Sequence, residues 1–323
     1  MQKLAVFTSG GDSPGMNAAI RAVVRTCVYH GLDVMGIVRG YEGMIDGDFI
    51  EMKSHSVSNI IQRGGTILKS ARSERFYNEK FRNQAFGNLK KHNLDGAVVI
   101  GGDGSFRGAL TLFNETGFPM IGIPGTIDND LFGTDFTLGY DTAINTAVEA
   151  IDKIRDTADS HDRLFFIEVM GRDAGFIALR SGIAGGAEAI LVPEDETSID
   201  RLIKTLEHGW RRNKTSSIVV VAEAGQTGRT FEIEKEVNQR FSHYETRVVI
   251  LGHMQRGGTP TTMDRVLAST LGVASVEALI RGEKNVMAGL VDKQVTFTPF
   301  EKATKHHHTV SAELMRIAEI LAV

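Results

Sequence analysis

The chain has one cysteine, Cys27, among its 323 residues. A single thiol forms neither an intramolecular disulfide nor a multi-cysteine zinc site, and such scarcity is typical of a reducing compartment. Cys27 lies on the apolar face of a predicted helix, residues 16–29, so we expect a core residue and not a nucleophile. The triplet His306–His308 is expected to be a solvated loop, because metal ligands are normally spaced apart by the fold.

Long apolar runs and an excess of basic residues are also missing. No run approaches the length of a membrane span, and the first one, residues 4–7, is too short for a signal peptide. The formal net charge of −4 argues against a nucleic-acid-binding protein. We therefore expect a cytoplasmic protein that binds neither membranes nor nucleic acid.

Three common nucleotide-binding signatures are absent. The chain contains no Gly-Lys pair, which excludes a Walker P-loop. Gly102 and Gly104 are followed by Arg107, where the dinucleotide fingerprint requires a third small residue. The Asp-Phe-Gly and His-Arg-Asp triplets of protein kinases do not occur. A dehydrogenase or a protein kinase is therefore disfavoured.

Short runs rich in Val and Ile alternate with helical patterns, which is typical of parallel βαβ units. The pattern predicts an α/β protein of two doubly wound lobes, each a three-layer αβα arrangement with a largely parallel sheet. The predicted strands are residues 4–7, 34–38, 97–100, 120–123, 164–169, 189–192, 218–222 and 248–251. The predicted helices are residues 16–29, 79–92, 105–113, 142–157, 199–212, 232–241 and 263–281.

Polar residues follow three of these strands directly, in the segments 8–15, 101–105 and 124–130. Ligands of open α/β sheets bind just beyond the carboxyl ends of the strands. Glycine turns between a strand and a helix aim backbone N–H groups at phosphate. Segment 124–130 alone, Pro-Gly-Thr-Ile-Asp-Asn-Asp, is equally compatible with a solvated turn. The two glycine-rich segments favour a phosphate site.

The second half of the chain carries another set of polar residues near strand ends. Arginine forks suit phosphate and carboxylates suit sugar hydroxyls, so this set resembles a cradle for a phosphosugar. Arg163 and Arg247 precede predicted strands and so should lie at the opposite sheet edge from Arg172, which indicates that a neighbouring chain supplies them. The residues that follow strands are Met170, Gly171, Arg172, Glu223, and the segment 252–258 with His253 and Arg256.

Five segments together resemble the signatures of the 6-phosphofructokinase family, in order and at matching separations. The resemblance extends from residue 3 to about residue 321. The segments are Gly10-Gly11-Asp12, residues 101–105, residues 124–130, Met170-Gly171-Arg172 and residues 252–258.

This resemblance implies transfer of the γ-phosphoryl group of ATP to the 1-hydroxyl of fructose 6-phosphate, with Mg²⁺, in glycolysis. Asp128 matches the general base of the family and Asp103 its magnesium-associated carboxylate. Asp130 would help to hold the metal or orient Asp128. Thr126 and Arg172 would contact the transferring group. The matched ATP contacts are Gly11, Arg72, Ser73, Gly102, Asp103, Gly104 and Ser105, and the matched sugar contacts are Arg163, Met170, Gly171, Arg172, Glu223, Arg247, His253 and Arg256.

By the same resemblance, residues 1–139 and about 252–303 form the ATP lobe, and residues 140–251 and 304–323 form the sugar lobe. Arg163 and Arg247 would come from an adjacent subunit of a homotetramer. An intersubunit effector site would involve Arg21, Arg25, Arg155, Glu188, Arg212 and Lys214. Ser54 replaces an arginine common at that site, and Thr215-Ser216 replace a basic pair, so weakened control by ADP or phosphoenolpyruvate is expected.

Three alternatives remain open. A different small-molecule kinase would share the Gly-Gly-Asp-Gly turn but would not need segments 170–172 and 252–258 together. A pyrophosphate-dependent enzyme is disfavoured by Gly104 and Gly125, where such enzymes carry an acidic residue and a lysine. A nucleotide sensor without catalysis would tolerate loss of Asp128.

Overall fold

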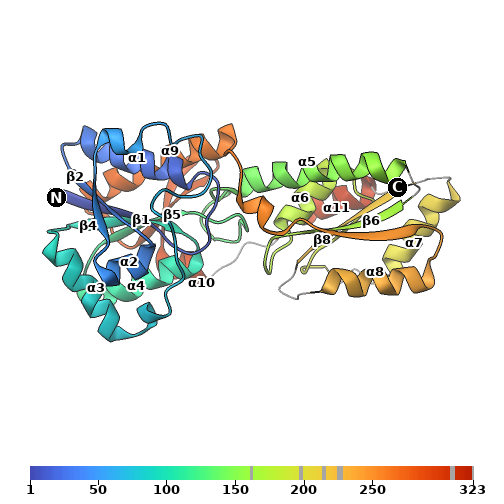
Figure 1. Cartoon of the computed structure of the whole chain (residues 1–323), viewed down its shortest axis with the longest axis horizontal. Helices are drawn as coiled ribbons and strands as arrows, with labels where there is room; N and C mark the ends of the chain where they lie inside the picture. The colour runs from blue at the N-terminus through green and yellow to red at the C-terminus, as the bar shows by residue number, and fades with distance from the viewer. Residues whose placement is uncertain (161–162, 196–198, 213–215, 224–227, 306–309, 322–323) are drawn as a thin grey trace. The chain divides into compact units, whose positions relative to one another are not determined.

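The computed structural model describes residues 1–160, 163–195, 199–212, 216–223, 228–305 and 310–321. The chain divides into two compact units (Figure 1). Unit 1 comprises residues 1–142 and 256–308, and unit 2 comprises residues 143–255 and 309–323. In the described part of the chain, no helix has the length and apolar character needed to span a membrane. The predicted loop at His306–His308 lies outside the described residues.

Unit 1 contains a seven-stranded sheet in the order β11-β10-β5-β4-β1-β2-β3. Its central strands are parallel, whereas β3 and β11 pair antiparallel with β2 and β10. The strands are β1 (Lys3–Thr8), β2 (Asp33–Ile37), β3 (Phe49–Met52), β4 (Gly96–Gly101), β5 (Met120–Pro124), β10 (Val286–Val291) and β11 (Gln294–Pro299). Every residue of β4 and β5 is buried, as expected for parallel strands covered on both faces.

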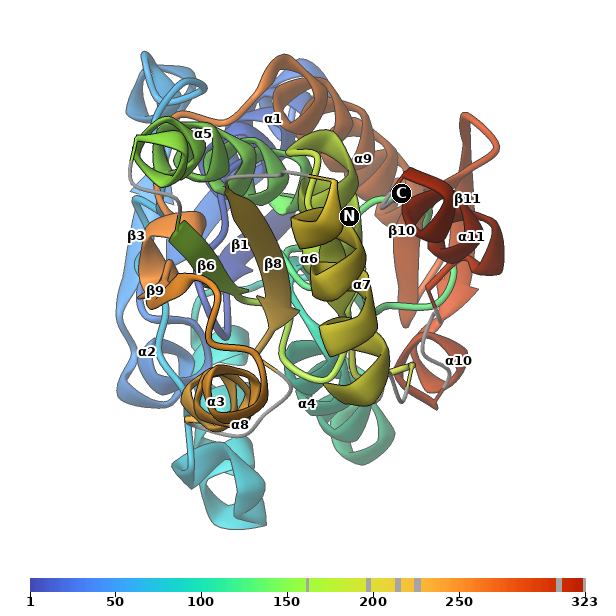
Figure 2. The same cartoon turned by 90° about the vertical axis from the view of Figure 1, so that its right-hand side faces the viewer.

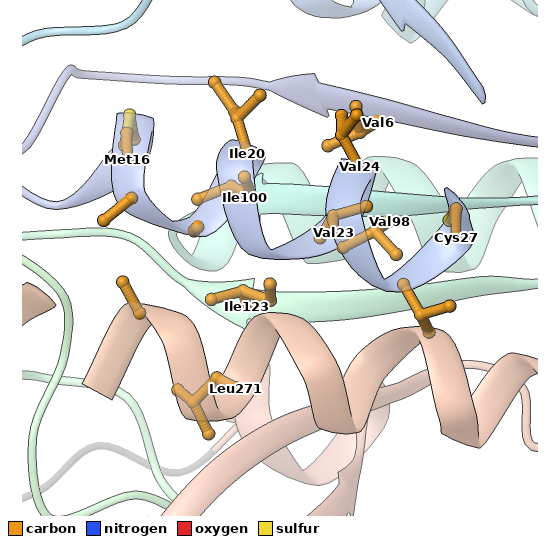
Figure 3. Packing of buried hydrophobic residues seen from close by; sticks show 14 of the residues in the cluster. Val6, Met16, Ile20, Val23, Val24, Cys27, Val98, Ile100, Ile123 and Leu271 are labelled. Atoms are coloured by element: carbon orange, nitrogen blue, oxygen red, sulfur yellow. The ribbon is translucent and has the colours of Figure 1, made fainter. Parts of the chain in front are cut away.

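Helices cover both faces of this sheet, and each interface has its own apolar core. One core joins the sheet to α1 (Met16–Tyr29) and α9 (Thr262–Ile280), where Ile20, Val23 and Leu271 meet Val98 and Ile123 (Figure 3). On the other face lie α2 (Gly40–Asp46), the short helix η2 (Arg75–Tyr77), α3 (Glu79–Lys91), α4 (Asp103–Thr116) and α10 (Phe300–Lys305). The short helix η1 (Ser54–Val57) contributes Val57 to the core with α1.

Cys27 belongs to the core between α1 and the sheet, as predicted (Figure 3). Its side chain is fully buried. Burial raises the pKa of the thiol to about 12. The thiolate form is therefore strongly disfavoured, which confirms a structural residue.

Unit 2 contains a parallel four-stranded sheet in the order β7-β8-β6-β9, of which β8, β6 and β9 are labelled in Figure 2. The strands are β6 (Arg163–Val169), β7 (Ala189–Leu191), β8 (Ser217–Ala222) and β9 (Glu245–Ile250). The helices are α5 (Tyr140–Asp159), which begins in unit 1, α6 (Phe176–Ala184), α7 (Ile199–Arg211), α8 (Arg229–Arg240), the short η3 (Gly252–Arg256) and α11 (Ala312–Leu321). An apolar core joins α7 and α8 to one face of this sheet.

The predicted α/β class with two sheets and helices on both faces is confirmed. The last strand of unit 2 was predicted at residues 248–251, but β9 begins earlier, at Glu245, and ends at Ile250. Arg247 is thus the third residue of β9 and does not precede it. The sequence also failed to indicate β3, β10, β11, α2, α6, α10 and α11.

A buried carboxylate at Asp264 fixes the start of α5 from the first turn of α9. Its two oxygens accept hydrogen bonds from the backbone N–H of Gly139 at 2.8 Å and of Thr142 at 2.9 Å, and from the Thr142 hydroxyl at 2.5 Å. Burial raises the pKa of Asp264, and these hydrogen bonds oppose the rise. Asp264 therefore supplies hydrogen-bond acceptors for the buried N–H groups at the start of α5, which have no acceptor within the helix.

We predict that Asp264→Asn lowers the free energy of unfolding by about 1–3 kcal/mol, because an amide replaces one of the two acceptor oxygens with a donor. Because the folded pKa is raised, the wild type loses stability as pH rises above the ordinary aspartate value. The difference in free energy of unfolding between the wild type and Asp264→Asn should be larger at about pH 4 than at about pH 7. Urea unfolding at both pH values measures this, with exposed Asp33→Asn as the control; an advantage that grows with pH would contradict the assignment.

Candidate active site

The sheet of unit 1 reverses its winding at β1, whose neighbours are β2 on one side and β4 on the other. Such a switch point opens a crevice at the carboxyl ends of the strands, where α/β proteins bind ligands. The turns after β1 and β4, residues 9–15 and Gly102, emerge at this point. The segment 124–130 follows β5, the next strand in the sheet. All three polar segments predicted from the sequence therefore share one sheet edge.

The two glycine turns are in direct contact. The backbone N–H of Ser9 donates to the carbonyl of Ile100 at 3.0 Å. A Cβ on Gly101 would lie 2.6 Å from the carbonyl oxygen of Ser9 and 2.5 Å from Oγ of Ser105, so only glycine fits there. Gly10 has a φ of 84°, which favours glycine. The turns therefore form one surface of backbone groups.

Helix α4 begins in this surface without a side-chain cap at Gly102. The first turn of a helix carries N–H groups that have no partner within the helix, which suits an anion. Among the described residues, no atom outside the adjoining residues and the backbone of α4 itself lies within 4 Å of the position that a Cβ on Gly104 would occupy. The carboxylate of Asp103 forms an ion pair with Arg107 at 2.9 Å, one helical turn away. Open space at Gly104 thus coincides with the N-terminus of α4.

The segment 124–130 is fastened to the same edge. The N–H of Gly125 donates to the carbonyl of Gly101 at 2.9 Å, and the N–H of Asp128 donates to Oγ1 of Thr126 at 3.2 Å. Asp128 is 7% exposed. Asn129 adopts a left-handed φ of 54°, and its side-chain oxygen accepts from the N–H of Thr137 at 2.8 Å. This side chain locks the turn, a role that the sequence did not reveal.

Gly125 packs against core side chains, in contrast to Gly104. A Cβ there would lie 3.1 Å from Cγ2 of Ile100 and 3.1 Å from Cε of Met16. These contacts belong to the core beneath the turn. A side chain at Gly125 would therefore press on the core, whereas Gly104 borders open space.

Arg256 lies against the first glycine turn within unit 1. Its guanidinium donates from NH1 to the carbonyl of Asp12 at 3.3 Å. A Cβ on Gly11 would come within 2.8 Å of the same nitrogen. A fixed guanidinium beside a glycine turn is a strong partner for phosphate. Arg72 is exposed and Ser73 partly exposed in the segment before η2, also in unit 1.

Unit 2 gathers its own polar residues at the carboxyl ends of β6, β8 and β9. The backbone N–H of Arg172 donates to Oε1 of Glu223 at 3.0 Å, and the N–H of Glu223 donates to the carbonyl of Val169 at 3.0 Å. Arg172 has a φ of 56°, unusual for a residue with a side chain, and its side chain is largely exposed. Met170 and Gly171 lie in the same turn, and exposed His253 lies in η3 after β9.

Arg163 and Arg247 lie at the other end of this sheet. Arg163 is the first residue of β6 and is paired in register with Glu245, the first residue of β9. Nε of Arg163 lies 2.8 Å from Oε2 of Glu245, and Arg247 contacts the other oxygen of this carboxylate. Within unit 2, Arg163 is therefore separated from Arg172 by the length of β6, as the sequence predicted, whereas Arg247 lies in the amino-terminal half of β9 and its side chain reaches back to Glu245.

The residues of the expected effector site fall in both units. Arg21 and Arg25 lie on α1, and Arg21 has a lowered pKa, because of burial and the neighbouring charge of Arg25. In unit 2, NH2 of Arg155 donates to the carbonyl of Gly186 at 2.8 Å, and its NH1 lies 3.9 Å from Oε1 of Glu188. Arg212 follows α7, and Lys214 lies outside the described residues.

Comparison with known proteins places this arrangement of turns in a family. The sequence model described as Phosphofructokinase matches residues 3–279. The chain belongs to the phosphofructokinase family. It is 54% identical to a relative from Cytophaga hutchinsonii named ATP-dependent 6-phosphofructokinase, over 99% of this chain and 98% of the relative.

Another relative and a solved structure agree with this family. The ATP-dependent 6-phosphofructokinase 1 of Thermus thermophilus is 54% identical over the full length of both chains. The solved phosphofructokinase of Saccharomyces cerevisiae superposes with a TM-score of 0.87 at 36% identity, and the match covers 94% of this chain and 45% of the yeast chain. The family thus accounts for both units of this chain.

Phosphofructokinases are generally Mg²⁺-dependent, and the carboxylates of unit 1 can be compared with what this ion requires. Mg²⁺ prefers one or two carboxylates, with phosphate oxygens and water completing its shell. Across the described residues, no cluster of three or more His, Cys, Asp and Glu side chains forms a metal cage. Asp103 presents a partly exposed carboxylate at the start of α4, beside the space at Gly104. A single carboxylate of this kind fits an Mg²⁺ ion that is bound together with the phosphates of a nucleotide.

Proposed function

We infer that the protein transfers the γ-phosphoryl group of ATP to the 1-hydroxyl of fructose 6-phosphate, giving fructose 1,6-bisphosphate and ADP, a step of glycolysis. The observation that carries this inference is the full-length identity of 54% to relatives named ATP-dependent 6-phosphofructokinase. The geometry agrees, since phosphoryl transfer depends mainly on positioning and on charge stabilisation. Both requirements are met at one sheet edge, where glycine turns and the start of α4 can hold the phosphates and the buried carboxylate of Asp128 can accept a proton.

We assign the ATP contacts to residues of unit 1. The turns at Gly11 and residues 102–105 would hold the phosphates with Arg72 and Ser73, and Asp103 would hold Mg²⁺, which neutralises charge between the phosphate groups. Asp128, buried beside Thr126, would accept the proton of the attacking hydroxyl. Asp130 would orient Asp128 or share the metal. Thr126 would donate to the transferring group.

We assign most of the sugar contacts to residues of unit 2. Glu223 and the turn 170–172 are joined by a hydrogen bond and would hold the sugar hydroxyls. His253 and Arg256, both in η3, would contribute further sugar contacts. Arg172 would contact the transferring phosphoryl group as its charge spreads. Arg163 at the start of β6 and Arg247 in the first half of β9 both contact Glu245, away from the carboxyl ends of the strands, so we assign them to the sugar phosphate of a neighbouring subunit. This requires a homo-oligomer, which we propose to be a homotetramer in the cytoplasm.

A steady-state assay with fructose 6-phosphate tests the function, with ATP and again with pyrophosphate as the donor. We expect turnover with ATP only. Turnover with pyrophosphate alone would identify a pyrophosphate-dependent enzyme instead. Nucleotide binding without turnover would favour a sensor.

We predict weak effector control. Ser54 is exposed in η1 and offers no charge where an arginine is common, so an anionic effector loses a charge-assisted hydrogen bond. Titration with ADP or phosphoenolpyruvate should shift the half-saturating concentration of fructose 6-phosphate by less than about fivefold. Ser54→Arg should enlarge the shift, and a conservative Ser54→Thr serves as the control. Strong activation of the wild type by ADP with a sigmoidal fructose 6-phosphate curve would contradict this prediction.

A further inference from the structure

The segment that carries Arg72 and Ser73 has no regular secondary structure between Leu68 and η2. A segment outside the sheet and helices must be held by other contacts if its side chains are to meet a ligand in a fixed geometry. At its start, the Thr8 hydroxyl donates to the carbonyl of Lys69 at 2.8 Å. Its far end is held by side chains of α2.

The carboxylate of Glu42, in the first turn of α2, holds two residues of this segment at once. Its Oε1 accepts from the Ser73 hydroxyl at 2.5 Å. Its Oε2 accepts from Nε of Arg75 at 2.8 Å and also from NH2 of Arg75. Arg75 further contacts Asp46 at 2.9 Å, at the end of the same helix. Both oxygens of Glu42 are therefore engaged by groups on either side of Glu74.

The same helix is also fixed to the phosphate-binding turn. Tyr41, the neighbour of Glu42, is buried, and its hydroxyl donates to the carbonyl of Ser105 at 2.5 Å. Its ring stacks on Phe76 with centroids 4.1 Å apart. One short helix thus connects the turn at Ser105 to the segment around Ser73. A displacement of that segment would change the spacing between Ser73 and the turn.

An exposed ion pair usually contributes little to stability. The Glu42 side chain differs, since it is 18% exposed and accepts from three donors. The guanidinium and the Ser73 hydroxyl hold the pKa of Glu42 below its usual range. The carboxylate is therefore ionised at neutral pH and able to hold both partners continuously.

We propose that Glu42 and Arg75 are positioning residues that fix the Arg72–Ser73 segment against the nucleotide site and thereby set the affinity for ATP. The proposal rests on the proposed function. Neither residue is assigned a contact with ATP, fructose 6-phosphate or the reacting atoms. Their effect should consequently appear in ATP binding and leave the chemical step and the sugar site unchanged.

Glu42→Gln tests the proposal, because the amide keeps the shape but loses the charge and one acceptor. We expect the KM for ATP to rise about tenfold, as for the loss of one or two charge-assisted hydrogen bonds. The kcat and the KM for fructose 6-phosphate should stay within about twofold. Arg75→Lys, which keeps the charge without the forked geometry, should give an intermediate value. Calorimetric titration with ATP, without the sugar, should give the tightest binding for the wild type, weaker binding for Arg75→Lys and the weakest for Glu42→Gln.

The matched control is Asp48→Asn, which removes the ion pair of Asp48 with Arg39 near the same helix but touches no residue of the 72–75 segment. It should leave both KM values unchanged. Inactivity of the wild type with ATP and fructose 6-phosphate would refute the proposed function itself. An active wild type together with an unchanged KM for ATP in Glu42→Gln would overturn the positioning role. So would a loss of melting temperature and kcat without a selective change in ATP affinity.

Discussion

Replacing Asp128 by serine is expected to lower kcat by about 10²–10⁴-fold with a much smaller change in either KM. A general base acts on the hydroxyl proton in the transition state, so its loss slows the chemical step and affects substrate binding little. Asp128 is suited to this role because the turn that carries it is fixed by Asn129 and by the link between Gly125 and Gly101. Steady-state kinetics with both substrates varied provides the measurement.

Asp135→Ser is the matched control for this prediction. Asp135 lies in the same loop and has the same side chain, but it is exposed and accepts from the N–H of Asp292 at 2.9 Å, in the turn between β10 and β11 and not at the switch point between β1 and β4. Its replacement should leave kcat within about twofold. If Asp128→Ser kept wild-type kcat, or lost activity only through a raised KM, Asp128 would not be the base.

The alternation of apolar runs and helical patterns predicted the parallel centre of both sheets, because buried parallel strands are uniformly apolar. Both edges of the unit 1 sheet, β3 and the hairpin of β10 and β11, escaped prediction, and β9 at one edge of the unit 2 sheet was predicted three residues late. The hairpin of β10 and β11 turns at Asp292 and Lys293, which have φ values of 50° and 64°. Such a turn is normally signalled by Asn-Gly or Asp-Gly, so the pair Asp-Lys gave no warning. Strand β9 is an edge strand with exposed charges at Glu245 and Arg247, and its apolar pattern starts only at Val248.

Of the candidate site, the sequence could predict the segments that meet at the sheet edge, because strand ends and glycine turns are local features. Contacts between distant side chains could not be predicted. Glu42 and Arg75 resemble ordinary surface charges, and nothing in their spacing indicates that they share Ser73. Asp264 likewise looks like a first-turn acid of α9, although its carboxylate holds the start of α5. Such pairings depend on packing between elements, which no local pattern encodes.

Gly104→Asp is expected to lower kcat/KM for ATP by about 100-fold or more, while the stability of the protein stays unchanged. The new side chain would enter open space at the first turn of α4, so it would displace no atom. A carboxylate there suits the helix start but adds a negative charge where the phosphates of ATP are proposed to bind. Two such charges about 4 Å apart repel by about 1–4 kcal/mol between water and a protein surface, and a triphosphate multiplies the effect. Kinetics with ATP and thermal unfolding measure the two quantities separately.

Gly104→Ala separates charge from bulk, because a methyl group in the same space meets no neighbour. It should retain ATP turnover within about threefold and keep the melting temperature. Gly125→Ala should behave in the opposite way, since its methyl group would press on Ile100 and Met16 and destabilise the core by about 1–3 kcal/mol. Equal kinetic losses in Gly104→Ala and Gly104→Asp would contradict an electrostatic effect. Only the combination of a stable Gly104→Asp, inactive with ATP, and an active Gly104→Ala places the phosphates of ATP at the start of α4.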